Sequence, residues 1–274
     1  MQHLKYILGY LVGLVLFYEP FMFFRRLLEN YLPETSFTSI HVPCARIPLA
    51  NLVTGGWQDI GAMSLLFCTL LAVGSLILGP CFCGRLCPAG ALGEYLSKLV
   101  PSKYKINWLQ YVPVAPLRYG FLGGFIISLW FGLPSPCAYC NYYCLEMVLH
   151  WAATGQALTD GLSLALTFTI TYIFLGMFTL GGRGYCNFFC PVGAASSLLH
   201  MLGRALPFAY SMQVKAGSCI GCGQCAKACP MVAIRLRNKE AHIEYTHCIT
   251  CGKCVAACPT KALAYRRNKN EGKA

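Results

Sequence analysis

Eighteen cysteines occur in this chain of 274 residues, and most of them fall into short, repeated spacings. Residues 219–230 read C-x-x-C-x-x-C-x-x-x-C-P, and residues 248–259 repeat the pattern with a period of 29 residues. Thiolates are soft ligands that suit iron–sulfur clusters, and this spacing places three of them around one cluster while the fourth reaches a second cluster. The repeated motif therefore predicts two [4Fe–4S] clusters.

Each predicted cluster takes three cysteines from one motif and the last cysteine of the other. The first ligand set is Cys219, Cys222, Cys225 and Cys258, and the second is Cys248, Cys251, Cys254 and Cys229. A pair of zinc ribbons is the alternative interpretation. Disulfides are disfavoured because we expect this part of the chain in a reducing compartment.

A different cysteine motif, C-x-x-x-C-P-x-G-A, also occurs twice, at residues 83–91 and 186–194. The tripeptide Pro-Cys-Ala recurs as well, at 43–45 and 136–138. We interpret these recurrences as a tandem repeat, whose pseudo-twofold axis would bring equivalent positions together. The four thiols gathered in this way predict a third [4Fe–4S] cluster, held by Cys83, Cys87, Cys186 and Cys190. Reduced thiols that pack helix ends, or redox-active dithiols, are the alternatives.

The same repeat would bring a third group of four cysteines together, which are Cys44, Cys137, Cys140 and Cys144. Three interpretations stay open for this group: a fourth [4Fe–4S] cluster, two disulfides, or a copper site, since copper also prefers soft ligands. We expect the two isolated cysteines, Cys68 and Cys81, to fill apolar space.

The elements that would position these cysteines are apolar. The chain is 56% hydrophobic and only 12% charged, whereas soluble domains carry about 25% charged residues. Each of four apolar runs approaches the ~20 residues that a helix needs to cross a membrane. The sequence therefore predicts four transmembrane helices, at residues 4–24, 60–80, 116–133 and 161–180.

The basic residues predict an orientation for these helices, because Lys and Arg concentrate in cytoplasmic loops. The part of the chain from residue 181 has thirteen of them, and residues 134–160 have none. We therefore expect both termini in the cytoplasm and residues 134–160 on the outer face of a bacterial or archaeal cytoplasmic membrane. The net charge of +12 is then explained by topology, and we do not expect nucleic-acid binding.

These observations predict an α-helical membrane protein with a C-terminal α+β domain. Residues 1–204 would form the four-helix transmembrane domain, with repeat units at about 1–105 and 106–204. Residues 205–265 would form a two-cluster ferredoxin domain in the cytoplasm, and residues 266–274 a basic flexible tail.

Four apolar spans, the motifs CGRLCP and CNFFCP, and the two ferredoxin motifs together resemble the NapH-type membrane iron–sulfur proteins. The C-terminal part of NosR and the CcoG-type oxidoreductases are similar. The resemblance implies a quinol dehydrogenase component of a multisubunit complex, which would transfer electrons between a quinone pool, its clusters and a periplasmic partner. The extra cysteines on the outer face, and Cys81, depart from the NapH pattern.

Three side chains are candidates to accept a proton from a quinol: Glu19, His41 and His150. Glu19 could instead be a helix-kink partner beside Pro20. We expect the other histidines, including His200 and His247, at the surface. Because the inner and outer cysteines would be separated by ~30 Å of hydrocarbon, a bound quinone or a second chain would have to bridge them.

Two other functions fit the same motifs. The chain could be an assembly factor that reduces a metal or a thiol during maturation of another enzyme, as the CcoG-type proteins do. It could also be a membrane anchor whose ferredoxin domain docks a soluble enzyme.

Overall fold

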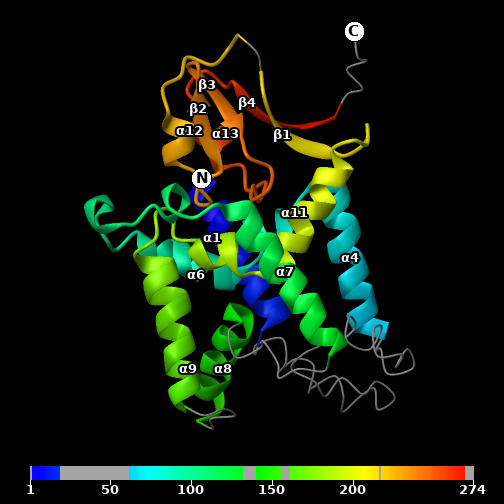
Figure 1. Cartoon of the computed structure of the whole chain (residues 1–274), viewed down its shortest axis with the longest axis vertical. Coiled ribbons are helices and arrows are strands. Elements are labelled where there is room, and N and C mark those ends of the chain that lie inside the picture. Colours follow the sequence, from blue (N-terminus) through cyan, green and yellow to red (C-terminus); the bar gives the residue numbers. More distant parts are fainter. Residues whose placement is uncertain (1, 19–61, 132–139, 156–160, 216, 269–274) are drawn as a thin grey trace.

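The computed structural model describes residues 2–18, 62–131, 140–155, 161–215 and 217–268. Figure 1 shows two regions. The described residues up to Gly203 form a helical region, and a smaller region with strands lies at one end of it, next to the N-terminus.

The helical region contains four long elements and two pairs of short helices. The long elements are α1 (Gln2–Phe17), α4 (Ala62–Leu78), α7 (Val114–Trp130) and α9 (Gly161–Phe168), which continues as the π-helical segment η5 (Thr169–Met177). The short pairs are α5 (Cys81–Arg85) with α6 (Pro88–Ser97), and α10 (Gly184–Phe188) with α11 (Pro191–Gly203). The region also contains α8 (Asn141–Thr154) and the single turns η2 (Ser102–Tyr104) and η3 (Trp108–Gln110).

The prediction of four transmembrane helices is wrong. Among the residues that the structure describes, no helix is both long enough and apolar enough to cross a membrane. The runs at 4–24, 60–80, 116–133 and 161–180 are apolar, but hydropathy does not fix where a helix ends. Helix α4 ends at Leu78 because Gly79, with φ of 73°, and Pro80 follow it. The run that begins at Gly161 changes from α-helical to π-helical geometry after eight residues.

The long helices nevertheless present apolar side chains outward. Leu4 and Leu8 of α1, Leu70 of α4, and Trp130 of α7 are all more than half exposed. The outer face of the helical region is therefore apolar over several helices.

Helices of the two predicted repeat units pack against each other across the molecule. Helix α6, which follows the first CxxxCP motif, packs against η5 of the second unit. Helix α11, which follows the second motif, packs against α4 of the first unit and also against α7. This exchange places both motifs in the middle of the molecule, directly beneath the region with strands (Figure 1).

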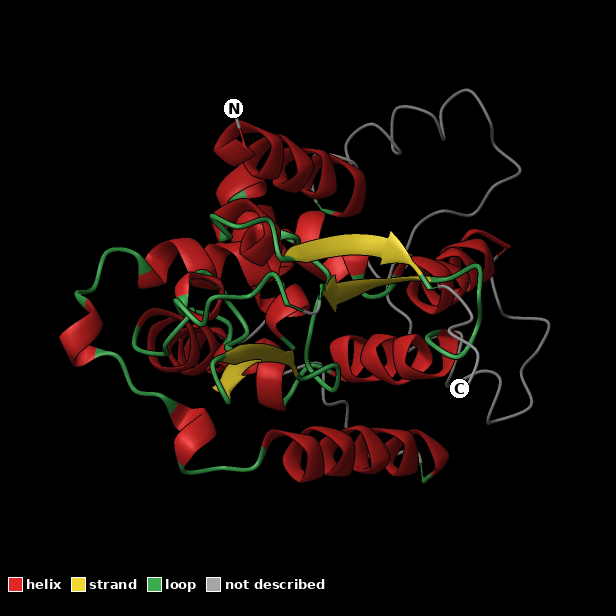
Figure 2. Ribbon diagram, turned by 90° about the horizontal axis from the view of Figure 1, so that it is seen from above, coloured by secondary structure: helices red, strands yellow, loops and turns green. Residues whose placement is uncertain are grey.

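The C-terminal region has the predicted α+β composition. Strand β1 (Tyr210–Val214) pairs antiparallel with β4 (Leu263–Arg267), and β2 (Ile234–Arg237) pairs antiparallel with β3 (Glu240–Ile243). Figure 2, seen from above, shows these two small sheets in front of the helices. Two short helices, α12 (Gln224–Lys227) and α13 (Lys253–Ala257), each contain one of the predicted cluster ligands. The predicted domain boundaries stay predictions.

Candidate iron–sulfur sites

The second predicted ligand set surrounds a cavity inside the C-terminal region. Its four cysteines line one small cavity; they are Cys229, Cys248, Cys251 and Cys254. Apolar side chains, among them Met212, Met231 and Ile249, complete the wall. Burial, together with the charge of the neighbouring Cys251, raises the pKa of Cys229 and of Cys254 to about 12.

The lining of this cavity has the chemistry that a cluster needs. Four cysteines face one space, which is the number of thiolate ligands that a [4Fe–4S] cluster takes. Buried neighbouring thiols are costly to ionise, whereas iron binds the thiolate and offsets its charge. The donor set and the apolar wall therefore suit a [4Fe–4S] cluster.

The first predicted ligand set lies closer to the surface. Cys225 is buried, Cys219 and Cys258 are half-buried, and Cys222 is exposed. Burial raises the pKa of Cys225, and the nearby thiols of Cys219 and Cys258 raise it further, so the structure brings these three together. Cys222 is on the same loop, between Gly221 and Gly223, which both have positive φ angles.

The two CxxxCP motifs fold in the same way. In each, a five-residue helix ends two residues before the second cysteine, and that cysteine caps a longer helix that begins with Pro. The Cys87 sulfur accepts a hydrogen bond from the Gly90 amide at 3.5 Å, and the Cys190 sulfur accepts one from the Gly193 amide at 3.3 Å. Pro at the first helical position costs no hydrogen bond, which explains the C-P dipeptide.

The four CxxxCP thiols lie together, as the predicted pseudo-twofold axis requires. Burial raises the pKa of Cys83 to about 12 and that of Cys87 to about 11, and in both cases neighbouring thiols of the motifs add to the shift. Burial also raises the pKa of Cys190 well above its usual value, with further increases from Cys186 and Cys83. We name Cys83, Cys87, Cys186 and Cys190 the CxxxCP tetrad. Its donor set also suits a [4Fe–4S] cluster.

Two buried arginines hold the backbone of the tetrad. The Arg183 guanidinium donates a 2.7 Å hydrogen bond to the Cys83 carbonyl, and the Arg118 guanidinium donates one of the same length to the Cys186 carbonyl. Both side chains are less than 3% exposed. Their positive charges lower the pKa of Cys83 and of Cys186, in opposition to the larger effect of burial.

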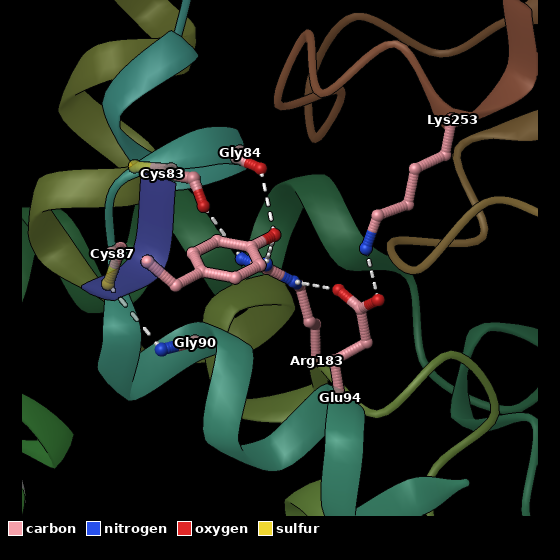
Figure 3. A network of polar contacts seen from close by, with 8 residues as sticks. Cys83, Gly84, Cys87, Gly90, Glu94, Arg183 and Lys253 are labelled. Carbon is pink, nitrogen blue, oxygen red and sulfur yellow. Dashed lines mark hydrogen bonds and ion pairs between the residues drawn. The ribbon is translucent and has the colours of Figure 1, made fainter. Parts of the chain in front are cut away.

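Arg183 also connects the helical region to the C-terminal region (Figure 3). Its guanidinium forms a 3.2 Å ion pair with Glu94 of α6, and Glu94 forms a second, short ion pair with Lys253 of α13. The hydroxyl of Tyr10 accepts a hydrogen bond from Arg183 and donates one to the carbonyl of Gly84. In the sequence, Lys253 lies between Cys251 and Cys254 of the second ligand set. The network of polar contacts therefore joins the tetrad to that ligand set.

The two sites are also in direct contact. A Cβ atom added at Gly84 would lie 2.3 Å from the Ile249 carbonyl oxygen and 3.0 Å from the Cys251 Cα atom, so only glycine fits there. The Asn187 amide donates a 3.3 Å hydrogen bond to the carbonyl of Met231. One apolar cluster contains cysteines of both sites, namely Cys83, Cys186, Cys229, Cys248 and Cys251.

The cysteines predicted for the outer face are only partly described. Cys44 and Cys137 lie outside the described residues, Cys140 is half-buried at the start of α8, and Cys144 is buried. Cys144 packs in one apolar cluster with Tyr18 and Tyr172, and Cys87 of the tetrad packs against the same cluster. For Cys144, the expectation that the thickness of a membrane separates it from the tetrad is therefore wrong. The described cysteines form no disulfide.

The other predicted residues have mixed outcomes. Glu19 and His41 lie outside the described residues, and His150 is buried in α8. Cys68 and Cys81 are half-buried. The expectation that His200 and His247 lie at the surface is wrong, because both are buried.

Sequence reasoning missed Glu94 and Lys253. It predicted no role at the site for Arg118 or Arg183 and used such basic residues only to predict the orientation of the helices. Arg183 nevertheless stands three residues before Cys186.

Comparison with known families shows that the cysteine motifs lie in 4Fe-4S domains. Residues 211–259 match the 4Fe-4S dicluster domain, and residues 60–107 and 162–208 both match the 4Fe-4S binding domain. The first match contains both ferredoxin motifs, and the second and third each contain one CxxxCP motif. No solved structure matches the chain.

Three relatives show how far the similarity extends. "Putative electron transport protein YccM" of Escherichia coli is 27% identical over 66% of this chain and 49% of its own length. "Uncharacterized protein MJ0749" of Methanocaldococcus jannaschii is 26% identical over 57% of this chain and 54% of its own. "Methylamine utilization ferredoxin-type protein MauN" of Methylobacillus flagellatus is 37% identical over 25% of this chain and 23% of its own. The chain thus spans about half the length of the first two relatives.

Proposed function

We propose that this iron–sulfur electron-transfer protein is a relay with three cluster sites in a row. The first site is the exposed ligand set that contains Cys222, the second is the enclosed set around Cys251, and the third is the CxxxCP tetrad. When bound, each cluster would accept and release one electron at a time. The order follows from the burial of the sites and from their contacts.

The contact between Gly84 and Cys251 is the observation that supports the relay most directly. Electron tunnelling falls off exponentially with distance, so neighbouring sites must be close. Gly84 follows the tetrad ligand Cys83, and Cys251 is a ligand of the second set, so their contact leaves no space between the two sites for a further group. Cys225 of the first set and Cys254 of the second lie in the same apolar core, which joins these two sites as well.

The buried charges around the tetrad suit a redox centre. Four thiolates carry more negative charge than the positive iron–sulfide core of a cluster offsets, and every added electron increases the net negative charge. Arg118 and Arg183 place two cations beside these sulfurs in a buried environment, where charges interact strongly. They would therefore favour the reduced form and raise the reduction potential.

Iron and acid-labile sulfide per chain, measured after anaerobic purification, test the relay. Three [4Fe–4S] sites predict about twelve irons in the wild type. C186S should lose about four of them and keep the two ferredoxin-type signals in electron paramagnetic resonance (EPR). The matched control is C68S, outside every predicted set. An unchanged iron content in C186S would show that the tetrad holds no cluster and would overturn the three-site relay.

The group with Cys140 and Cys144 would add a fourth site. Its position beside Cys87 supports this extension, because it would continue the row beyond the tetrad. A disulfide pair and a copper site stay as alternatives for this group.

The roles of quinol dehydrogenase component and of assembly factor also stay predictions from resemblance. Of the three candidate proton acceptors for a quinol, only His150 is among the described residues.

A further inference from the structure

We infer that the exposed face of the first cluster site is a docking surface for a small acidic electron-carrier protein. This inference rests on the proposed relay and specifies where electrons enter or leave it. The surface, which we name the Cys222 face, consists of Ile220, Cys222, Lys227, Arg235, Leu236, Arg237 and Lys239.

The Cys222 face is one continuous surface made by two segments. A Cβ atom added at Gly221 would lie 2.7 Å from the Lys239 carbonyl oxygen, and one added at Gly223 would lie 3.4 Å from the Leu236 side chain. The cysteine loop therefore lies directly against the β2–β3 hairpin. The pairing of Arg237 with Glu240 places the end of β2 beside the start of β3, and Lys239 in the turn between them lies against the loop.

The Cys222 face is where a partner can come closest to a cluster ligand. Cys222 is the exposed cysteine among the described ligand sets, and Ile220 beside it is 64% exposed. By contrast, Cys251 and Cys254 of the second set are each 8% exposed, and the C-terminal region covers the tetrad. A partner protein that exchanges electrons by contact would therefore dock at the first site.

The charge of this region selects an acidic partner. Residues 205–268 contain nine basic and two acidic residues. On the Cys222 face, Arg237 approaches Glu244 at 3.7 Å, with both side chains open to solvent. The structure shows no ion pair for Lys227, Arg235 or Lys239 within the described part of the chain. Unpaired basic groups around a redox site attract a complementary acidic surface and speed its approach.

The apolar side chains of the surface favour a protein over a nucleic acid. Ile220 and Leu236, which is 42% exposed, are apolar side chains on the same surface as the basic residues. Protein interfaces combine both kinds of side chain, with an apolar core and a polar rim. Nucleic acids are bound mainly through phosphates and do not need apolar side chains next to a redox ligand. The exchange would move one electron between carrier and chain, and no bond would form or break.

Binding of an acidic plant-type [2Fe–2S] ferredoxin to the anaerobically purified full-length protein tests the inference. We expect the Kd to rise steeply with salt, because screening weakens contacts between opposite charges. The charge-reversal variant R235E/K239E should bind at least about tenfold more weakly. K103E is the control, because Lys103 is exposed in η2, outside the Cys222 face. A basic cytochrome c should show the opposite trend and bind the double variant more tightly.

Several results would overturn the inference. One is a wild-type Kd for ferredoxin that does not change with salt, which needs no variant. Another is that K103E and R235E/K239E weaken the binding of ferredoxin equally. A third is tight binding of a 20-mer oligonucleotide without binding of ferredoxin. If R235E/K239E loses iron, K227E on α12 replaces it. The proposed relay can fail while the docking inference holds. That outcome would be a C186S variant that keeps all its iron and still binds ferredoxin in a salt-dependent way.

Discussion

The guanidinium of Arg183 lies 2.7 Å from the carbonyl oxygen of Cys83 and places a buried positive charge beside the CxxxCP tetrad. We expect R183Q to lower the reduction potential of the tetrad site, because the charge that favours the reduced form is lost. An effect of about 1.4 kcal/mol would appear as a shift of ~60 mV for one electron. A redox titration followed by EPR measures this shift.

Two further variants separate charge from structure. R183K keeps the charge but not the fork of hydrogen bonds, so it should recover part of the potential. R85Q removes an exposed arginine from the same motif and should leave the potential close to the wild-type value. If R85Q and R183Q lower the potential equally, net charge and not the position of Arg183 sets the potential.

Gly84 should tolerate no side chain. We expect G84A to be destabilised and to separate the tetrad from the second site, because its Cβ atom would meet the Ile249 carbonyl oxygen at 2.3 Å. The measurement is the midpoint of unfolding in urea under anaerobic conditions. G120A is the matched control, because a Cβ atom at Gly120 of α7 meets nothing within 4 Å. It should be neutral or more stable by up to about 1 kcal/mol. Equal effects of the two changes would refute the close contact at Gly84.

Much of the arrangement of cysteines could be predicted from spacing alone, since repeated motifs have few ways to surround a cluster. The structure brings the CxxxCP tetrad together as the repeat suggested. Helix ends were not predictable from hydropathy, because Gly79 and the change to π-helical geometry after Phe168 are local backbone events. The position of Cys144 near Cys87 was also not predictable from the sequence, because it depends on how the helices pack and not on their order along the chain.

Glu94 should contribute strongly to stability. Its carboxylate lies between Arg183 and Lys253, which lowers the pKa of Glu94 against the opposing effect of burial. E94Q leaves two cations without their partner, and breaking a buried ion pair costs roughly 3–5 kcal/mol. Thermal or urea unfolding measures this loss. The exposed Glu240 of β3 supplies the control E240Q, which should change stability by less than about 0.5 kcal/mol. A similarly small effect of E94Q would show that the network is energetically unimportant.

His200 predicts a decline in stability at mildly acidic pH. It is buried in α11 near Tyr245, and burial, helped by the positive charge of Arg204, lowers its pKa to about 4. An unfolded histidine titrates near 6.5. Between these values the unfolded chain binds a proton that the folded chain does not, so stability falls as pH falls through this window. The slope should reach about 1.4 kcal/mol per pH unit. The buried His247, whose pKa burial also lowers to about 4, should add a similar amount to the slope. Urea unfolding at pH 7.0, 6.0 and 5.0 measures the slope, and H200Q should reduce it by about half while H242Q, at an exposed site, should not change it.

The described cysteines of α8 lead to the last prediction. If Cys140 and Cys144 hold a cluster together with Cys137 and Cys44, the wild type should contain about sixteen irons, and both C137S and C144S should lose about four. The buried position of Cys144 beside the tetrad means that C144S could disturb Cys87 as well, whereas C137S tests the fourth site from a different segment. Twelve irons in the wild type, unchanged in C137S, would exclude the cluster. Copper bound per chain and the number of free thiols would then distinguish the two remaining alternatives.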